Sequence, residues 1–191
     1  MKPPVPRLAL AACLALAACR SPSSAAKAFH DPNMDFGAVR TVAVLPFVNL
    51  SRDQSAGDRV RDVLATSLFT TGSIYVVPAG DVARAVSGGG IVNPSTPTVD
   101  DVVRLGKLLK ADAVITGVVK EYGEVRSGSA GANVVSLSAQ MQETGTGRVV
   151  WAASTTKGGI GASERMFGGG GAPLNDVTQA AVDDLLDKLF R

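Results

Sequence analysis

Two cysteines, at positions 13 and 19, are the residues of this chain best suited to covalent chemistry. Cys19 ends the tetrapeptide Leu-Ala-Ala-Cys, follows an apolar stretch over residues 8–18 and precedes a polar, serine-rich segment. Basic residues before an apolar stretch, with small residues at its end, are typical of a signal peptide. A cysteine directly after the small residues indicates a bacterial lipoprotein. The pattern predicts cleavage after residue 18 and attachment of diacylglycerol to the Cys19 sulfur.

Cys13 ends a second Leu-Ala-Ala-Cys tetrapeptide, but too few apolar residues separate it from Arg7 for a usual signal peptide. Cys19 is therefore the predicted lipidation site. Two alternatives are an ordinary secretory signal and a transmembrane helix, although the apolar stretch is well short of the ~20 residues that a bilayer requires. Arg20 follows Cys19 in place of the aspartate associated with inner-membrane retention in enteric bacteria, which favours the outer membrane.

Patterns for catalysis or cofactor binding are missing from the rest of the sequence. The only histidine, His30, lies just after Cys19, where we expect a solvent-exposed side chain. A domain without histidine has neither a Ser-His-Asp triad nor an HExxH zinc motif. The adjacent carboxylates at 100–101 and 183–184 would point to different sides of a helix, and the glycine runs lack the phosphate-loop pattern. We therefore expect no enzymatic activity, cofactor or metal.

The charge balance argues against nucleic acid as a partner. The chain carries 19 Lys and Arg against 17 Asp and Glu. Removal of residues 1–18 takes away Lys2 and Arg7 but no acid, which leaves the mature chain neutral. Basic clusters with interleaved aromatic residues, the usual footprint of nucleic-acid binding, are also missing.

After the signal peptide, the sequence divides into a lipidated N-terminus with a short tether (19–37) and one globular domain (38–191). Residues 20–35 would reach about 50 Å if fully extended, so the domain stays near its membrane. Continuous apolar runs predict buried strands, and spacings of three and four residues predict helices. The order βαβα(α)βββα indicates an α/β (α+β) fold, with helices packed on a mixed sheet of about five strands. The expected helices cover 54–69, 81–86, 100–110 and 175–190, and the expected strands cover 41–47, 73–78, 113–119, 135–142 and 148–153.

A predicted antiparallel hairpin turns at residues 144–147. Its first strand alternates apolar and polar residues, which fits a half-buried strand; Trp151 in the second strand is expected to pack in the core. The same alternation fits a membrane-spanning hairpin, whose strands have ~9–11 residues. We favour the core interpretation, because the aromatic girdle of membrane strands is missing and the soluble sheet would otherwise keep three strands. The alternating apolar residues are Val135, Leu137, Ala139 and Met141.

Met166 and Phe167 lie in a glycine-rich segment and are candidates for contact with a partner. The alternative, which we favour, is that they hold that segment against the core. The surrounding loop 157–173 and the Gly- and Pro-rich loop 88–98 are the expected mobile contact regions, because loops on a rigid scaffold commonly carry binding residues.

Three segments resemble the CsgG/LpoB-like family of bacterial lipoproteins. Residues 41–51 (TVAVLPFVNLS) resemble the opening strand of that family, residues 111–117 (ADAVITG) a later strand, and residues 143–151 (ETGTGRVVW) its hairpin. The resemblance covers the chain from about Val39 onward. It implies a fold similar to the N-terminal domain of TolB, with no catalytic residues to carry over.

The resemblance also implies a place and a class of function. This family includes outer-membrane lipoproteins that activate penicillin-binding proteins, and the curli secretion channel. We therefore expect a periplasm-facing module that is anchored by its lipid and binds envelope proteins, with activation of a peptidoglycan synthase as the most concrete version. The alternative is an oligomeric component of an outer-membrane secretion channel.

Overall fold

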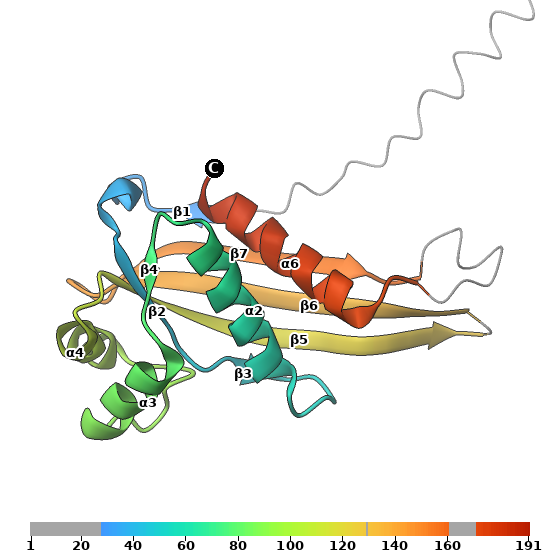
Figure 1. The fold of residues 1–191 in the computed structure, drawn as a ribbon, viewed down its shortest axis with the longest axis horizontal. Coiled ribbons are helices and arrows are strands. Elements are labelled where there is room, and N and C mark those ends of the chain that lie inside the picture. Colours follow the sequence, from blue (N-terminus) through green and yellow to red (C-terminus); the bar gives the residue numbers. More distant parts are fainter. Residues whose placement is uncertain (1–27, 129, 161–170) are drawn as a thin grey trace, which may run out of the picture.

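The computed structural model describes residues 28–128, 130–160 and 171–191. The described strands form one mixed sheet in the order β1-β7-β6-β5-β2-β4, and β3 also pairs with β5 (Figure 1). The strands β2, β3, β4 and β5 pair in parallel, whereas β5, β6, β7 and β1 pair antiparallel. The elements are β1 (Ala28–His30), the 3₁₀ turn η2 (Phe36–Ala38), β2 (Thr41–Val44), β3 (Val48–Asn49), α2 (Ala56–Thr70), β4 (Tyr75–Val76), α3 (Ala79–Gly88), α4 (Val99–Leu109), β5 (Ala113–Ser127), β6 (Ala130–Glu143), β7 (Val149–Gly158) and α6 (Leu174–Leu189).

This arrangement confirms the predicted mixed sheet with helices packed on it. The expected helices and longer strands are all present, with ends displaced by a few residues. The sheet has seven strands rather than about five. The difference comes from β1 and β3, which are three and two residues long and too short to produce a periodic pattern.

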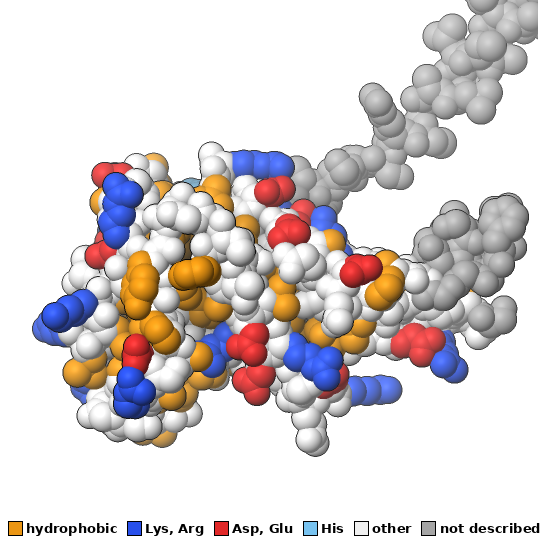
Figure 2. Space-filling view, in the orientation of Figure 1, with side chains coloured by type: hydrophobic (Ala, Val, Ile, Leu, Met, Phe, Trp, Pro, Cys, Tyr) orange, Lys and Arg blue, Asp and Glu red, His pale blue; other side chains and the backbone are white. Residues whose placement is uncertain are grey.

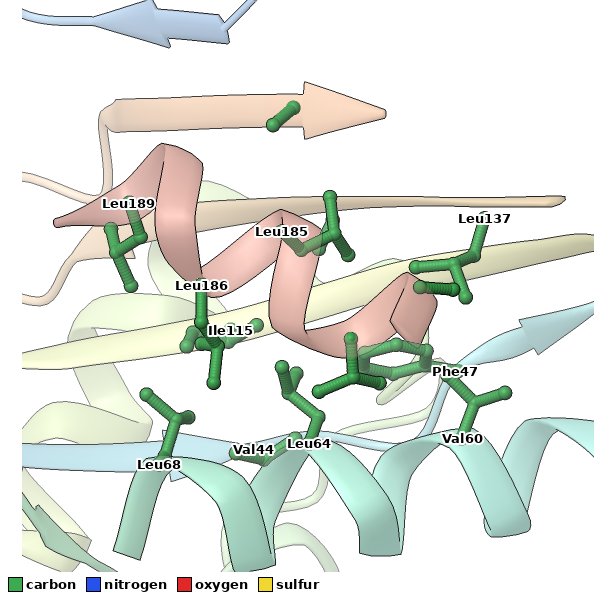
Figure 3. Packing of buried hydrophobic residues seen from close by; sticks show 14 of the residues in the cluster. Val44, Phe47, Val60, Leu64, Leu68, Ile115, Leu137, Leu185, Leu186 and Leu189 are labelled. Carbon is green, nitrogen blue, oxygen red and sulfur yellow. The ribbon is translucent and has the colours of Figure 1, made fainter. Parts of the chain in front are cut away.

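Each face of the sheet covers its own hydrophobic cluster, because successive side chains of a strand point to opposite faces. Val42 and Val44 of β2 belong to the larger cluster under α2 and α6. Ala43 and Leu45 belong to a smaller cluster under α3 and α4. In Figure 3, leucines of α2 and α6 point toward each other above the strands of the larger cluster.

The hairpin of β6 and β7 is part of this core. All four alternating apolar residues of β6 are at most 4 % exposed and belong to the cluster under α2 and α6. Trp151 is 1 % exposed, and its indole N–H donates to the carbonyl of Lys188 at 3.3 Å. The core interpretation of the hairpin is therefore confirmed. Among the described residues, none of the helices combines the length and apolar character that crossing a bilayer requires.

The three segments that carry the family resemblance meet in space. Phe47 of the first lies against Gly117 of the second, so closely that a β-carbon on Gly117 would approach the Phe47 ring to 2.4 Å. Thr144 of the third donates its hydroxyl to the carbonyls of Ala111 and Asp112, at 2.6 and 3.0 Å. These motif residues therefore hold the sheet together.

The folded domain begins earlier than the sequence predicted. Residues 28–37, assigned to the tether, include β1 and the first two residues of η2, and β1 pairs with β7 at the edge of the sheet. Asp31 is 6 % exposed and accepts a hydrogen bond from Arg148 at 2.7 Å. The expected exposure of His30 is also wrong: its ring packs edge-on against Phe36 at a centroid distance of 5.5 Å. Its Nε2 is buried and has no hydrogen-bond partner among the described residues.

Candidate interaction surface

The residues predicted to act directly fall outside the described part of the chain. These are the lipidation site Cys19 and the candidate contact residues Met166 and Phe167, which therefore stay predictions. The predicted contact loop 88–98 is described; it is held to the domain at two points, while most of its residues are exposed. Ile91 is buried, and Arg104 donates to the carbonyl of Gly89 at 2.8 Å.

The adjacent carboxylates at 183 and 184 differ in their surroundings. Asp184 is half-buried and accepts hydrogen bonds from Lys157 of β7, at 2.8 Å, and from Lys188 of its own helix. Burial alone would raise the pKa of Asp184, but the hydrogen bonds from the two lysines outweigh burial and hold that pKa well below its usual range. This ion-paired cluster joins α6 to β7.

One of the two adjacent carboxylates at the start of α4, Asp101, caps that helix. Asp101 accepts a hydrogen bond from the backbone N–H of Thr98, and Thr98 accepts one from the backbone N–H of Asp101. This reciprocal pair is a capping box, which stabilises a helix start. Among the described residues, no group of three or more His, Cys, Asp or Glu side chains could hold a metal ion.

A hollow of about 470 Å³ lies between loop 88–98 and the strands β5, β6 and β7. Hydroxyl, amide and small apolar side chains line it, and none of them carries a charge. Such a lining can hydrogen-bond a ligand, but it offers no base to activate a hydroxyl. The lining residues are Ser95, Thr96, Pro97, Thr116, Gly117, Val118, Ser138, Ala139, Gln140, Ala152, Ala153 and Ser154.

A more distinctive surface lies around β4, the last strand on one side of the described sheet. Hydrophobic side chains gather here between the ends of α2 and α3 (Figure 2). Phe69 of α2, Tyr75 of β4 and Leu108 of α4 are 64 %, 56 % and 52 % exposed. We call these three side chains, with the outer edge of β4, the β4-edge surface.

The β4-edge surface has a shallow depression and unpaired backbone groups. Tyr75 and Leu108 line a depression of about 420 Å³, bordered by the ion pair of Asp81 and Arg84. The N–H of Tyr75 donates to the carbonyl of Arg40, just before β2, and the N–H of Val77 donates to the carbonyl of Val42 in β2. The N–H and C=O of Val76 between them therefore point to the open side of the sheet. Exposed aromatic residues beside an unpaired strand edge form a surface that an extended segment of another protein can bind.

Sequence reasoning missed this surface. Phe69 follows the buried Leu68 directly and so lies off the apolar face of α2, which the helical spacing could have revealed. Tyr75 sits in a wholly apolar run, and nothing in that run distinguishes an edge strand from a central one.

Comparisons with known structures show a shared fold. A PelC dodecamer from Paraburkholderia phytofirmans is 16 % identical and matches with a TM-score of 0.57, covering 85 % of this chain and 96 % of that one. Lipoprotein GNA1162 from Neisseria meningitidis is 20 % identical, with a TM-score of 0.55 and coverages of 79 % and 98 %. The LpoB C-terminal domain from Salmonella enterica is 15 % identical, with a TM-score of 0.50 and coverages of 66 % and 86 %.

A search of curated proteins found no match to this sequence. A family model described as "Putative lipoprotein GNA1162-like" matches residues 35–190, nearly the whole described domain. Together with the LpoB-like fold, this match supports the resemblance to LpoB-like lipoproteins that the sequence motifs indicated. The chain belongs to the GNA1162-like family of lipoproteins.

Proposed function

We propose that this protein is a lipid-anchored module of the outer membrane that faces the periplasm and acts by binding another envelope protein. In this proposal Cys19 carries the lipid and no step of chemistry is catalysed. Membership of a lipoprotein family supports the anchor. The β4-edge surface is the observation that carries the binding role, because it combines three exposed apolar side chains with an unpaired strand edge.

The β4-edge surface suits a partner that adds a strand. An extended segment of the partner would pair with the free N–H and C=O of Val76 and place apolar side chains against Tyr75 and Leu108. The two-residue length of β4 limits uncontrolled pairing, because short edge strands present few free groups. Affinity would then come mainly from the aromatic side chains, as at most protein interfaces.

Activation of a peptidoglycan synthase is the most concrete version of this function. It is supported by the LpoB-like fold together with the sequence resemblance to lipoproteins that activate penicillin-binding proteins. A second proposal is self-association, as a component of an envelope channel or ring, which the dodecameric state of PelC supports.

Photo-crosslinking in living cells tests the binding role. A photoreactive phenylalanine analogue replaces Tyr75, and the matched control places it at Leu50, which is 66 % exposed beyond β3. The proposal predicts a crosslinked envelope protein, identified by mass spectrometry, from position 75 and not from position 50. A synthase in that product supports the activator version, and a second copy of this chain supports self-association. Equal products from both positions, or none from position 75, would contradict binding at the β4-edge surface.

A further inference from the structure

The hollow between loop 88–98 and the strands β5, β6 and β7 lies on the face of the sheet opposite α6. Leu137 and Ala139 of β6 pack in the cluster under α2 and α6, so the alternating Ser138 and Gln140 point the other way. We call this hollow the sheet-face hollow. Residues that pair directly across neighbouring strands point to the same face. One such row consists of Thr116, Gln140, Ala152 and Phe29, from β5, β6, β7 and β1.

Polar side chains on this face have hydrogen-bonding groups that the described chain does not use. Thr116 lines the hollow and is 4 % exposed. The side chains of Thr116, Ser138 and Gln140 make no hydrogen bond to another described residue. Gln142, two residues after Gln140 in β6, is 7 % exposed, and its Oε1 has no partner among the described residues. Because buried polar groups are usually paired, these free donors and acceptors favour a ligand that supplies partners for them.

The lining of the sheet-face hollow carries no charge. About a quarter of the residues of a soluble domain are charged, so an uncharged lining drawn from four segments is distinctive. Lys120 and Glu121 follow Val118 along β5, but they line a separate hollow. A charged ligand would lose its hydration here without gaining a counter-charge. The lining therefore favours an uncharged ligand that is rich in hydroxyl or amide groups.

Phe29 adds an aromatic surface to the end of the polar row. It is 49 % exposed and pairs with Ala152, which lines the hollow. Side chains that face each other across neighbouring strands have β-carbons about 4.5–5.5 Å apart, so the ring lies within reach of a ligand in the hollow. The face of an aromatic ring is electron-rich and attracts C–H groups. A sugar ring suits such a site, because it presents C–H groups on its face and hydroxyls around its edge.

Gln140 lies in the middle of the row and favours one kind of sugar. A side-chain amide offers both an N–H donor and a C=O acceptor. An acetamido group also presents an N–H and a C=O, so the two amides can pair reciprocally. The volume of about 470 Å³ falls in the range of small-ligand pockets, about 300–1,000 Å³. The hollow is therefore large enough for a short segment of a sugar chain.

We propose that the sheet-face hollow, with Phe29 at its border, binds an uncharged sugar chain that carries acetamido groups. The site is separate from the β4-edge surface, because β2 lies between β5 and β4 in the sheet order. A sugar chain and a protein partner can therefore be bound together. This inference does not rest on the proposed function, and its failure would leave crosslinking from position 75 unaffected.

Titration of the purified lipoprotein with tetra-N-acetylchitotetraose, an uncharged chain of acetamido sugars, tests this proposal. The protein is kept in a detergent without a sugar headgroup, and backbone amide signals are followed by NMR. Saturable shifts are expected at residues 28–30, 116–118, 138–140 and 152–154, with a Kd below about 1 mM. No saturable shift at about 10 mM sugar, or shifts confined to other residues, would overturn the proposal.

Two single substitutions test the side chains that carry the inference. Gln140→Ala and Phe29→Ala should each raise the Kd at least about fivefold. The matched controls are Gln179→Ala in α6 and Phe69→Ala in α2, both at exposed side chains away from the hollow, and they should leave the Kd within about twofold. An unchanged Kd for Gln140→Ala or Phe29→Ala, with the fold intact by circular dichroism, would overturn the site as proposed.

Two further sugars test the chemistry of the ligand on the unsubstituted protein. Cellotetraose has hydroxyls in place of the acetamido groups and should bind at least about fivefold more weakly. Equal binding of cellotetraose would contradict pairing with the Gln140 amide. An oligogalacturonate of the same length carries carboxylates and should not bind, because the hollow offers no cation. Binding of this anionic chain as tightly as the acetamido chain would overturn the proposal of an uncharged ligand.

Discussion

Substitution of Gly117 by alanine tests whether the family motifs interlock as the structure shows. The new β-carbon would lie 2.4 Å from one atom of the Phe47 ring and 2.7 Å from two others, well inside van der Waals contact. Phe47 is 7 % exposed and has little room to retreat. Overpacking of this kind costs ~1–3 kcal/mol, and alanine recovers ~0.5–1 kcal/mol of backbone entropy relative to glycine. The expected net loss is about 1–2 kcal/mol, or roughly 2–8 °C in Tm for a domain of this size.

Gly145→Ala is the matched control for this prediction. Gly145 is exposed in the turn before β7 and does not adopt a positive φ, and a β-carbon added there would meet no other atom within 4 Å. Thermal and denaturant unfolding of both variants should show a loss for Gly117→Ala and little change for Gly145→Ala. Phe47→Leu in the Gly117→Ala background should cost less than Phe47→Leu alone, because the clash is relieved. Unchanged or increased stability of Gly117→Ala would refute the close packing of these two motifs.

Three further predictions concern single side chains. Asp184→Asn should destabilise the domain by about 1–2 kcal/mol at neutral pH. Because ion pairing lowers the folded-state pKa of Asp184, its contribution to stability is present above the unfolded pKa near 4 and is lost as the pH falls below that value. Denaturation at several pH values should show that the free energies of unfolding of the variant and the unsubstituted protein converge in acid. A difference that stays constant with pH would contradict the pairing. Thr144→Val should lower the free energy of unfolding by about 1 kcal/mol, because the hydrogen bond of the Thr144 hydroxyl to the Ala111 carbonyl is lost. The control Thr156→Val, on the exposed face of β7, should lower it less. Equal losses would count against a stabilising role of the Thr144 hydrogen bond. Cys19→Ala should abolish incorporation of labelled fatty acid, and Cys13→Ala should not. The reverse result would show that Cys13, rather than Cys19, carries the lipid.

Periodicity in the sequence predicted the elements that bury a continuous face. The alternation in β6 and the helical spacing in α6 both correspond to side chains of the larger cluster. The same patterns could not reveal β1, because a three-residue strand on a sheet edge is stabilised by backbone pairing with β7 rather than by its own side chains.

Contacts between distant residues could not be predicted from spacing. Asp31 and Arg148 pair across most of the chain, and Lys157 of β7 reaches Asp184 of α6. Neither pair has a sequence signature, since the fold brings the partners together. The β4-edge surface was missed for a related reason: the exposure of Tyr75 depends on β4 being the last strand, which only the sheet order shows.

The affinity of the purified lipoprotein for its crosslinked partner tests the central claim most directly. Tyr75 exposes 56 % of its surface, and burial of roughly 100 Å² of aromatic surface contributes about 2–3 kcal/mol. Tyr75→Ser should therefore raise the Kd by roughly 30- to 150-fold, while Leu50→Ser should leave the Kd within about twofold of the unsubstituted protein. An unchanged Kd for Tyr75→Ser, with the fold intact by circular dichroism, would contradict partner binding at the β4-edge surface.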